Sequence, residues 1–170
     1  MPQTGTQRKD TLLSPLGPGW AEHGPAETGL VARGLRTDRL GPVDLDVAPG
    51  AALAVMGASG SGKTLLLRAL ADLDPARGDL SWRGVDRFAM AAPAWRRRVA
   101  YVPAEPGWWA ATPADHMADH MANGAAARAL LPAVDLTDDH LARPIAHLST
   151  GERQRLALVR ALILAPEVLL

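Results

Sequence analysis

The fold of this 170-residue chain is decided by one stretch, Gly57-Ala58-Ser59-Gly60-Ser61-Gly62-Lys63-Thr64. The stretch satisfies the pattern G-x-x-x-x-G-K-[ST], which describes a loop that cradles phosphates. Its glycines let successive backbone N–H groups point inward at phosphate oxygens, and the helix that follows adds the positive end of its dipole. Lys63 would place a full charge on the β- and γ-phosphates, and Thr64 would offer a hydroxyl to Mg²⁺. The loop therefore predicts a site for a nucleoside triphosphate with Mg²⁺.

The segments on either side of this loop have the patterns that such a site requires. Residues 51–56 form a continuously apolar run, which is typical of a strand buried on both faces in a parallel sheet. After the loop the apolar residues follow a helical period up to Pro75, at positions Leu66, Ala69, Leu70 and Leu73. The alternative interpretation is an ordinary glycine-rich turn. The order strand, glycine loop, helix favours a P-loop NTPase fold of the α/β class with a parallel sheet.

Composition excludes several classes of protein. The 18 basic and 18 acidic residues give a net charge of zero, which does not favour a nucleic-acid partner. The chain has no cysteine, so disulfides, iron–sulfur clusters and thiolate zinc sites are excluded. No run approaches the roughly 18 consecutive apolar residues of a transmembrane helix. We expect a cytoplasmic globular domain.

Further elements follow from the remaining patterns. Apolar or alternating runs predict strands at residues 29–35, 43–47, 80–83, 99–102 and 168–170. Helices are predicted at residues 93–98, across the alanine-rich segment 111–145, and from Ser149 to Pro166. In the last helix the predicted buried face comprises Leu158, Ala161, Leu162 and Ala165. Residues 1–28 are rich in Pro, Gly and Thr without a period, so we expect a disordered leader that contributes nothing to the site.

A second motif identifies the kind of P-loop protein. It reads Leu148-Ser149-Thr150-Gly151-Glu152-Arg153-Gln154-Arg155. One interpretation is a capping box at the start of an amphipathic helix, because Ser149 and Glu152 have the spacing S-x-x-E. The motif also resembles the signature sequence of ATP-binding cassette (ABC) ATPases, commonly LSGGQ followed by basic residues. Thr150 and Glu152 depart from the commonest letters, and both interpretations can hold together.

The resemblance covers residues 29–170 and implies a RecA-like core with a small helical subdomain at about residues 106–145. It implies a nucleotide-binding subunit that uses ATP and Mg²⁺ to power a separate transmembrane permease at the inner face of the membrane. Two such subunits, as a homodimer or a heterodimer, would share two sites. In each site the signature residues of one chain, Leu148, Ser149, Thr150, Gly151 and Glu152, would face the ATP held by the P-loop of the other.

Several positions depart from the family pattern. After Pro103 the family usually has a glutamine that helps to ligate Mg²⁺ and orient water, whereas this chain has Ala104 and Glu105. Glu105 could reach the metal instead, although a solvated side chain is the simpler interpretation. No aromatic residue between Gly29 and Lys63 is present to stack on the base. Arg36 or Arg39 could take that role, or both could be surface arginines.

The resemblance also concerns the end of the printed sequence. In the family the strand begun by Val168, Leu169 and Leu170 continues into an Asp and a Glu that serve Mg²⁺ and the attacking water, and a later His senses the γ-phosphate. We therefore expect the ABC domain to be incomplete at its C-terminus and these residues to hydrolyse ATP only slowly. Two alternatives remain: a soluble ABC ATPase that acts on nucleic acid or ribosomes, and an ATP-binding module without turnover.

Two lesser features lie between the motifs. His116 and His120 have the i, i+4 spacing of a zinc pair, but no third ligand is evident, so solvated histidines are the favoured interpretation. Trp108 and Trp109 follow the position of the missing glutamine, in the region that the family uses to dock on its membrane partner. Paired aromatics there predict either an interface or packing of the small helical subdomain.

Overall fold

The computed structural model describes residues 13–15, 29–117 and 123–170 and divides the chain into two units, residues 1–92 and residues 93–170. The first unit holds the predicted P-loop, and the second holds the predicted signature motif. None of the described helices is long and apolar enough to cross a membrane.

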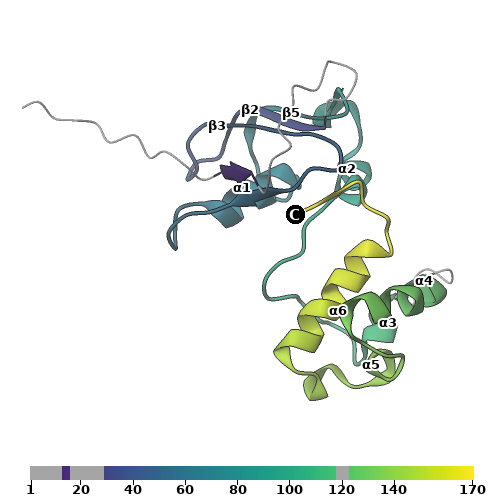
Figure 1. The fold of residues 1–170 in the computed structure, drawn as a ribbon. Helices are drawn as coiled ribbons and strands as arrows, with labels where there is room; N and C mark the ends of the chain where they lie inside the picture. The colour runs from purple at the N-terminus through teal and green to yellow at the C-terminus, as the bar shows by residue number, and fades with distance from the viewer. Residues whose placement is uncertain (1–12, 16–28, 118–122) are drawn as a thin grey trace, which may run out of the picture. The chain divides into compact units, whose positions relative to one another are not determined.

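An antiparallel sheet forms the larger part of the first unit (Figure 1). Its strands are β2 (Leu30–Arg36), β3 (Val43–Val47), β5 (Arg77–Trp82) and β6 (Val85–Asp86), in the order β3-β2-β5-β6. Side chains alternate between the two faces of a strand, and Leu30, Ala32 and Leu45 lie on the face of this sheet that is buried. The strands predicted at residues 29–35 and 43–47 are confirmed. A 3₁₀ turn, η2 (Arg87–Ala89), follows β6, and its buried Arg87 pairs with Asp72.

Helix α1 (Lys63–Leu70) packs against β2 in the same unit. It buries Leu66, Ala69 and Leu70, as the helical period predicts. Leu73, expected on the same face, is 40% exposed. The chain leaves the helix before that residue, because Asp72 takes a left-handed backbone with φ of 57°.

The strand that leads into the P-loop is shorter and less buried than its apolar sequence predicts. Strand β4 (Leu53–Val55) is half-buried, and in the described part of the chain it pairs with β1 (Leu13–Pro15) in antiparallel register. An apolar run reports that both faces can be buried, but it does not specify which strand lies alongside. The partner β1 lies in the segment expected to be a disordered leader. Residues 1–12 and 16–28 of that segment lie outside the described residues.

The second unit contains a short parallel pair of strands. After α2 (Ala92–Arg98), strand β7 (Val99–Ala100) pairs with β8 (Val168–Leu169), with Val99 opposite Val168. The pairing continues beyond the strands, since the N–H of Val102 donates to the carbonyl of Leu170 at 2.8 Å. Among the described strands this is the one parallel pair. It confirms the strands predicted at residues 99–102 and 168–170.

Helices make up the rest of the second unit (Figure 1). They are α3 (Pro113–Met117), α4 (Asn123–Leu130), α5 (Asp139–Ala142) and α6 (Thr150–Leu162), with 3₁₀ turns η3 (Leu131–Val134) and η4 (Ile145–His147). Their shared core comprises Met117, Ala127, Leu131, Leu136, Leu141, Leu148, Leu156 and Val159. Helix α6 therefore belongs to the same packing unit as the helices that precede it.

The buried face of α6 differs from the prediction. The structure buries Leu156, Ala157 and Val159, whereas the predicted set began at Leu158. The helix also ends at Leu162, so Ala165 lies beyond it. The sequence from Leu156 onward is apolar on more than one side of the helix, and a period alone cannot choose between neighbouring faces. The helices packed against α6 make that choice.

Candidate functional site

The predicted phosphate loop connects β4 to α1 and is open to solvent. Residues 57–61 are exposed. Gly60 and Gly62 have φ of 77° and 98°, in the left-handed region that side chains other than glycine rarely adopt. At Gly62 a Cβ atom would also lie 3.0 Å from Cδ1 of the buried Leu40. The two glycines therefore determine the path of the loop.

The start of α1 offers backbone donors. Gly62 is the N-cap residue of the helix and provides no side-chain hydrogen bond to it. The first intrahelical bond joins the N–H of Leu66 to the carbonyl of Gly62 at 2.9 Å. The N–H groups of Lys63, Thr64 and Leu65 precede that bond, so they can donate to an anion at the positive end of the helix dipole. The first turn of α1 carries no acidic residue that would repel such an anion.

Lys63 folds back over the loop. Its Nζ donates to the carbonyl of Gly57 at 2.7 Å and to that of Ala58 at 2.8 Å. The ammonium therefore lies over the backbone on which phosphates would rest. Thr64, the second residue of α1, is exposed and carries a hydroxyl group. Backbone N–H donors, a lysine and a hydroxyl form a donor set that suits a polyphosphate with a divalent cation, so the residues present fit ATP and Mg²⁺.

The signature motif forms the turn into α6 in the second unit. Leu148 is buried in the helical core, while Ser149 and Thr150 are exposed. The capping box is confirmed: the N–H of Glu152 donates to Oγ of Ser149 at 3.2 Å, and the N–H of Ser149 donates to Oε2 of Glu152 at 2.7 Å. Gly151 follows, and a Cβ there would lie 3.3 Å from the Arg155 guanidinium. The motif presents a fixed helix N-terminus with an exposed serine.

The pKa of Glu152 is lowered from 4.5 to about 2. The largest cause is the hydrogen bond from the backbone N–H of Ser149, followed by the hydrogen bond with the Ser149 side chain and by the nearby His140 and Arg143. A carboxylate with a depressed pKa stabilises the fold above its ordinary pKa, and that contribution is lost as the pH falls from about 4.5 toward 2. We expect a carbon-13 NMR titration to give a midpoint near 2 for Glu152. Glu152→Gln should be less stable than the parent at neutral pH, and the difference should narrow as the pH approaches 2. A midpoint at the ordinary value would contradict the hydrogen bonding described here.

The position of the missing glutamine lies beside the signature helix. The carbonyl of Ala104 accepts a hydrogen bond from Nε2 of Gln154 on α6 at 3.0 Å. Further along the same loop, Arg160 of α6 donates to the carbonyl of Gly107 at 3.1 Å. Glu105 is exposed. The structure thus brings Ala104 and the signature helix together through main-chain carbonyls.

The two tryptophans of this loop have different environments. Trp108 packs against the helical core, whereas Trp109 is 79% exposed. The guanidinium of Arg160 lies over both rings, 4.5 Å from the Trp108 centroid and 5.1 Å from the Trp109 centroid. The pair therefore divides the two predicted roles: Trp108 takes the packing role, and Trp109 is available to a partner.

His116 forms hydrogen bonds with the backbone of the same loop. Its Nε2 accepts the N–H groups of Trp109 and Ala110 at 3.1 and 2.9 Å. Burial, and then the charge of Arg160, lower the pKa of His116, which keeps the ring neutral as those bonds require. His120, the second member of the suggested zinc pair, lies outside the described residues. Over residues 13–15, 29–117 and 123–170 no group of three or more metal-ligating side chains occurs.

Sequence reasoning missed three residues of the second unit that hold the signature turn and the loop beside it. Gln154 is part of the quoted motif, but its partner Ala104 is 50 residues away in the chain. His140 and Arg143 contact Glu152 from a short helix and carry no motif. Only the spatial neighbourhood of Glu152 reveals them.

Comparison with known proteins places this chain among ABC ATPases. Residues 40–170 match the sequence model of the ABC transporter family. The chain is 39% identical over 135 residues to Protein STAR1 of Oryza sativa subsp. japonica, covering 75% of this chain and 39% of STAR1. It is 39% identical over 152 residues to the cytochrome c biogenesis ATP-binding export protein CcmA of Bordetella bronchiseptica, covering 84% of this chain and 66% of CcmA. The chain thus spans about two fifths to two thirds of the length of these curated relatives.

Solved structures show the same fold. A bacterial Atm1-family ABC exporter with ATP bound aligns with a TM-score of 0.63 at 20% identity, covering 84% of this chain and 29% of that one. An ATP-binding subunit of an ABC transporter aligns with a TM-score of 0.61 at 24% identity, covering 82% of this chain and 63% of that one. These likenesses confirm the P-loop NTPase fold. Since the family model covers most of its length, the chain belongs to the ABC transporter family.

Proposed function

We propose that this chain is the ATP-binding subunit of an ABC transporter and powers a separate membrane permease. The observation that carries the proposal is the P-loop, where Nζ of Lys63 donates to the carbonyls of Gly57 and Ala58 and no side chain caps the start of α1. The similarity to named ATP-binding transport proteins supports the same function. The zero net charge gives no support to a nucleic-acid partner.

The residues divide the binding of ATP among them. Gly57 to Gly62 supply backbone N–H groups to phosphate oxygens, and Lys63 exchanges its two carbonyl partners for phosphate charge. Thr64 would hold Mg²⁺ through its hydroxyl. ATP when bound supplies a phosphoanhydride bond whose cleavage can drive a conformational cycle. Arg36 and Arg39 are both exposed and could approach the base.

We also propose that two subunits share each site. The exposed Ser149 and the N–H groups at the start of α6 would bind the γ-phosphate held by the P-loop of the opposite subunit. The permease would be contacted at the inner face of the membrane, which places the subunit in the cytoplasm as a peripheral protein. The exposed Trp109 is available for that contact.

Titration calorimetry tests the proposal. We expect Mg-ATP to bind at least tenfold more tightly than Mg-AMP, because Lys63 and the helix N-terminus act on the β- and γ-phosphates that AMP lacks. We expect slow phosphate release in the same samples, because the methyl group of Ala104 can neither ligate Mg²⁺ nor orient water. Equal affinity for the two nucleotides would contradict the proposed site, and release at a rate of about 1 per second or more would contradict the role given to Ala104.

A further inference from the structure

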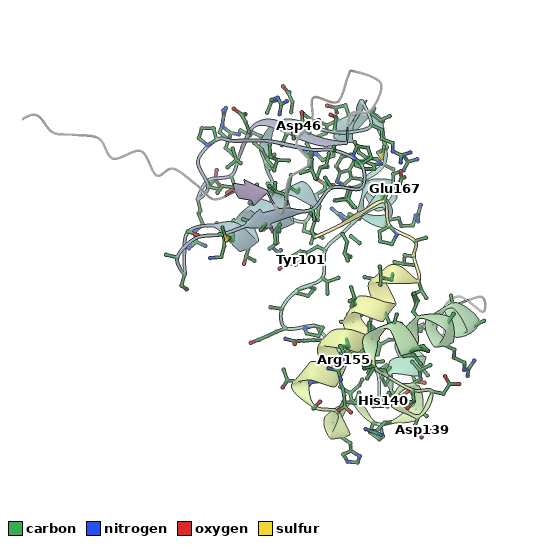
Figure 2. All side chains as sticks on the ribbon, in the orientation of Figure 1. Asp46, Tyr101, Asp139, His140, Arg155 and Glu167 are labelled. Atoms are coloured by element: carbon green, nitrogen blue, oxygen red, sulfur yellow. The ribbon has the colours of Figure 1, made fainter. Side chains whose placement is uncertain are left out.

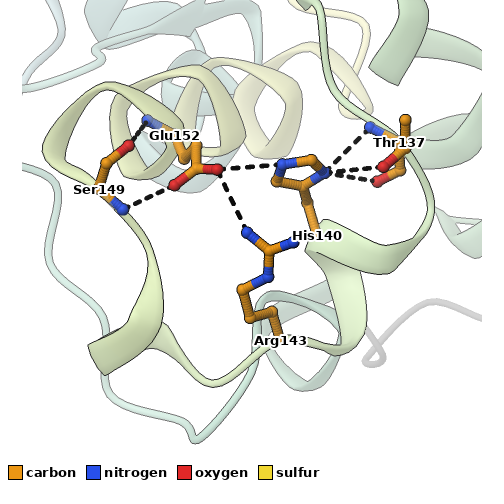
Figure 3. Close-up of polar contacts among 5 residues, drawn as sticks. All are labelled: Thr137, His140, Arg143, Ser149 and Glu152. Atoms are coloured by element: carbon orange, nitrogen blue, oxygen red, sulfur yellow. Dashed lines mark hydrogen bonds and ion pairs between the residues drawn. The ribbon is translucent and has the colours of Figure 1, made fainter.

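The carboxylate of Glu152 lies at the centre of a hydrogen-bond network that joins the signature turn to helix α5 (Figure 3). Its Oε2 accepts the N–H of Ser149 at 2.7 Å. Its Oε1 accepts from Nε2 of His140 at 3.1 Å and from the guanidinium of Arg143 at 3.3 Å. His140, labelled in Figure 2, belongs to α5, and Arg143 is the residue that directly follows this helix. One side chain thus binds two separate segments.

The proton on Nε2 of His140 follows from its contact with Glu152. Nδ1 of His140 lies 3.1 Å from the backbone nitrogen and 3.2 Å from the carbonyl oxygen of Thr137. The ionised carboxylate of Glu152 can only accept, so Nε2 of His140 carries a proton and donates to it. The side chains of His140 and Glu152 are 15% and 20% exposed, so water competes little for this bond. The network consists of three donors that converge on one acceptor group.

A glutamine at position 152 could not make this network. A carboxylate accepts at both oxygens, whereas an amide accepts at one and donates at the other. If Gln at position 152 kept the Ser149 bond through its oxygen, its NH₂ group would face the N–H donors of His140 and Arg143. Two sets of donors would then meet unless the proton of His140 moved from Nε2 to Nδ1, and the negative charge that holds Arg143 would be lost in either case.

We propose that Glu152 is a positioning residue, which fixes the signature turn against α5 so that Ser149 is held ready for the phosphate of the opposite subunit. The inference rests on the proposed function. It assigns to this chain a requirement for a carboxylate, and not merely an amide, at position 152. Ser149 and α5 are then held in one arrangement by a contact between residues 12 positions apart in sequence.

The first test reads the ring of His140 by nitrogen-15 NMR. In the parent protein at neutral pH we expect the tautomer with the proton on Nε2. In Glu152→Gln we expect the proton to move to Nδ1, where the carbonyl of Thr137 at 3.2 Å can accept it, because Nε2 must now accept from the new amide. Asp139→Asn removes the same charge from an exposed neighbour on α5 and should leave the parent tautomer. An unchanged tautomer in Glu152→Gln would overturn the inference.

The second test separates positioning from a general loss of stability. A tagged subunit that carries Lys63→Ala is expected to bind ATP in its own P-loop at least about 30-fold more weakly. In a mixed pair with an untagged subunit, its signature turn therefore completes the one site that keeps full affinity. The readout is capture of the untagged subunit by the tagged one when ATP pairs them. Glu152→Gln placed in the tagged subunit should raise the ATP concentration needed for this capture about tenfold. The same change in the untagged subunit should leave capture unchanged, since its signature faces the disabled P-loop.

The outcomes separate a failure of the role given to Glu152 from a failure of the proposed shared site. Equal losses in both arrangements would show that Glu152 is only structural, and no loss in either would show that it does not position Ser149. If the parent subunits fail to pair with ATP at all, the shared site under the proposed function is wrong. The tautomer of His140 would still decide whether Glu152 holds α5.

Discussion

Replacing Lys63 with alanine is expected to weaken Mg-ATP binding by at least about 2 kcal/mol, roughly 30-fold. The reason is the loss of the one side-chain cation on the loop, whose Nζ lies over the carbonyls of Gly57 and Ala58. These carbonyls are exposed, so water can replace the ammonium and the fold should be unaffected. Titration calorimetry measures the affinity, and thermal unfolding without nucleotide checks the fold.

A matched control is Arg33→Ala. It removes the same charge from the same unit, at a side chain that is half exposed and pairs with Asp46 on β3. Surface pairs of this kind contribute little to stability, and this one lies away from the loop in sequence. We expect its affinity for Mg-ATP to stay within twofold of the parent value. Equal affinity in Lys63→Ala and the parent would show that the loop does not bind the phosphates through Lys63.

Replacing Ser149 with arginine is expected to abolish dimerisation driven by ATP while one subunit still binds ATP through its P-loop. Ser149 is exposed at the start of α6, and arginine there would fill the space that a phosphate of the opposite subunit requires. The change also removes the capping bond to the N–H of Glu152, at a cost of about 1 kcal/mol. Light scattering with and without Mg-ATP measures the dimer.

The control for this variant is Ala146→Arg, which adds the same bulk and charge at an exposed residue of η4 shortly before the signature. It should unfold at nearly the parent temperature and dimerise normally. Unfolding in urea should show whether Ser149→Arg remains folded. An ATP-dependent dimer of folded Ser149→Arg would contradict the shared site.

The sequence alone determined the local chemistry of this protein. Gly60, Gly62 and Lys63 predict a phosphate loop, because the backbone and charge that such a loop requires lie within eight consecutive residues. Ser149 and Glu152 specify a capping box for the same reason, since both partners lie within one helical turn. The strands at residues 30–36 and 43–47 follow from apolar and alternating runs, and in the second the alternation is the pattern of a half-buried strand. The structure confirms the capping box and the two strands, while the phosphate loop stays a prediction.

Tertiary structure decided which face of each element is buried and which distant side chains pair. The apolar surface of α6 offers several faces, and packing against α3 and α4 buries Leu156 and Val159 instead of Leu158. Trp108 and Trp109 are identical in sequence terms, yet packing encloses the first and exposes the second. The contact of His140 with Glu152 has no local signal at all. Burial and side-chain pairing are properties of surfaces that meet only after folding, because residues distant along the chain supply the two sides of each contact.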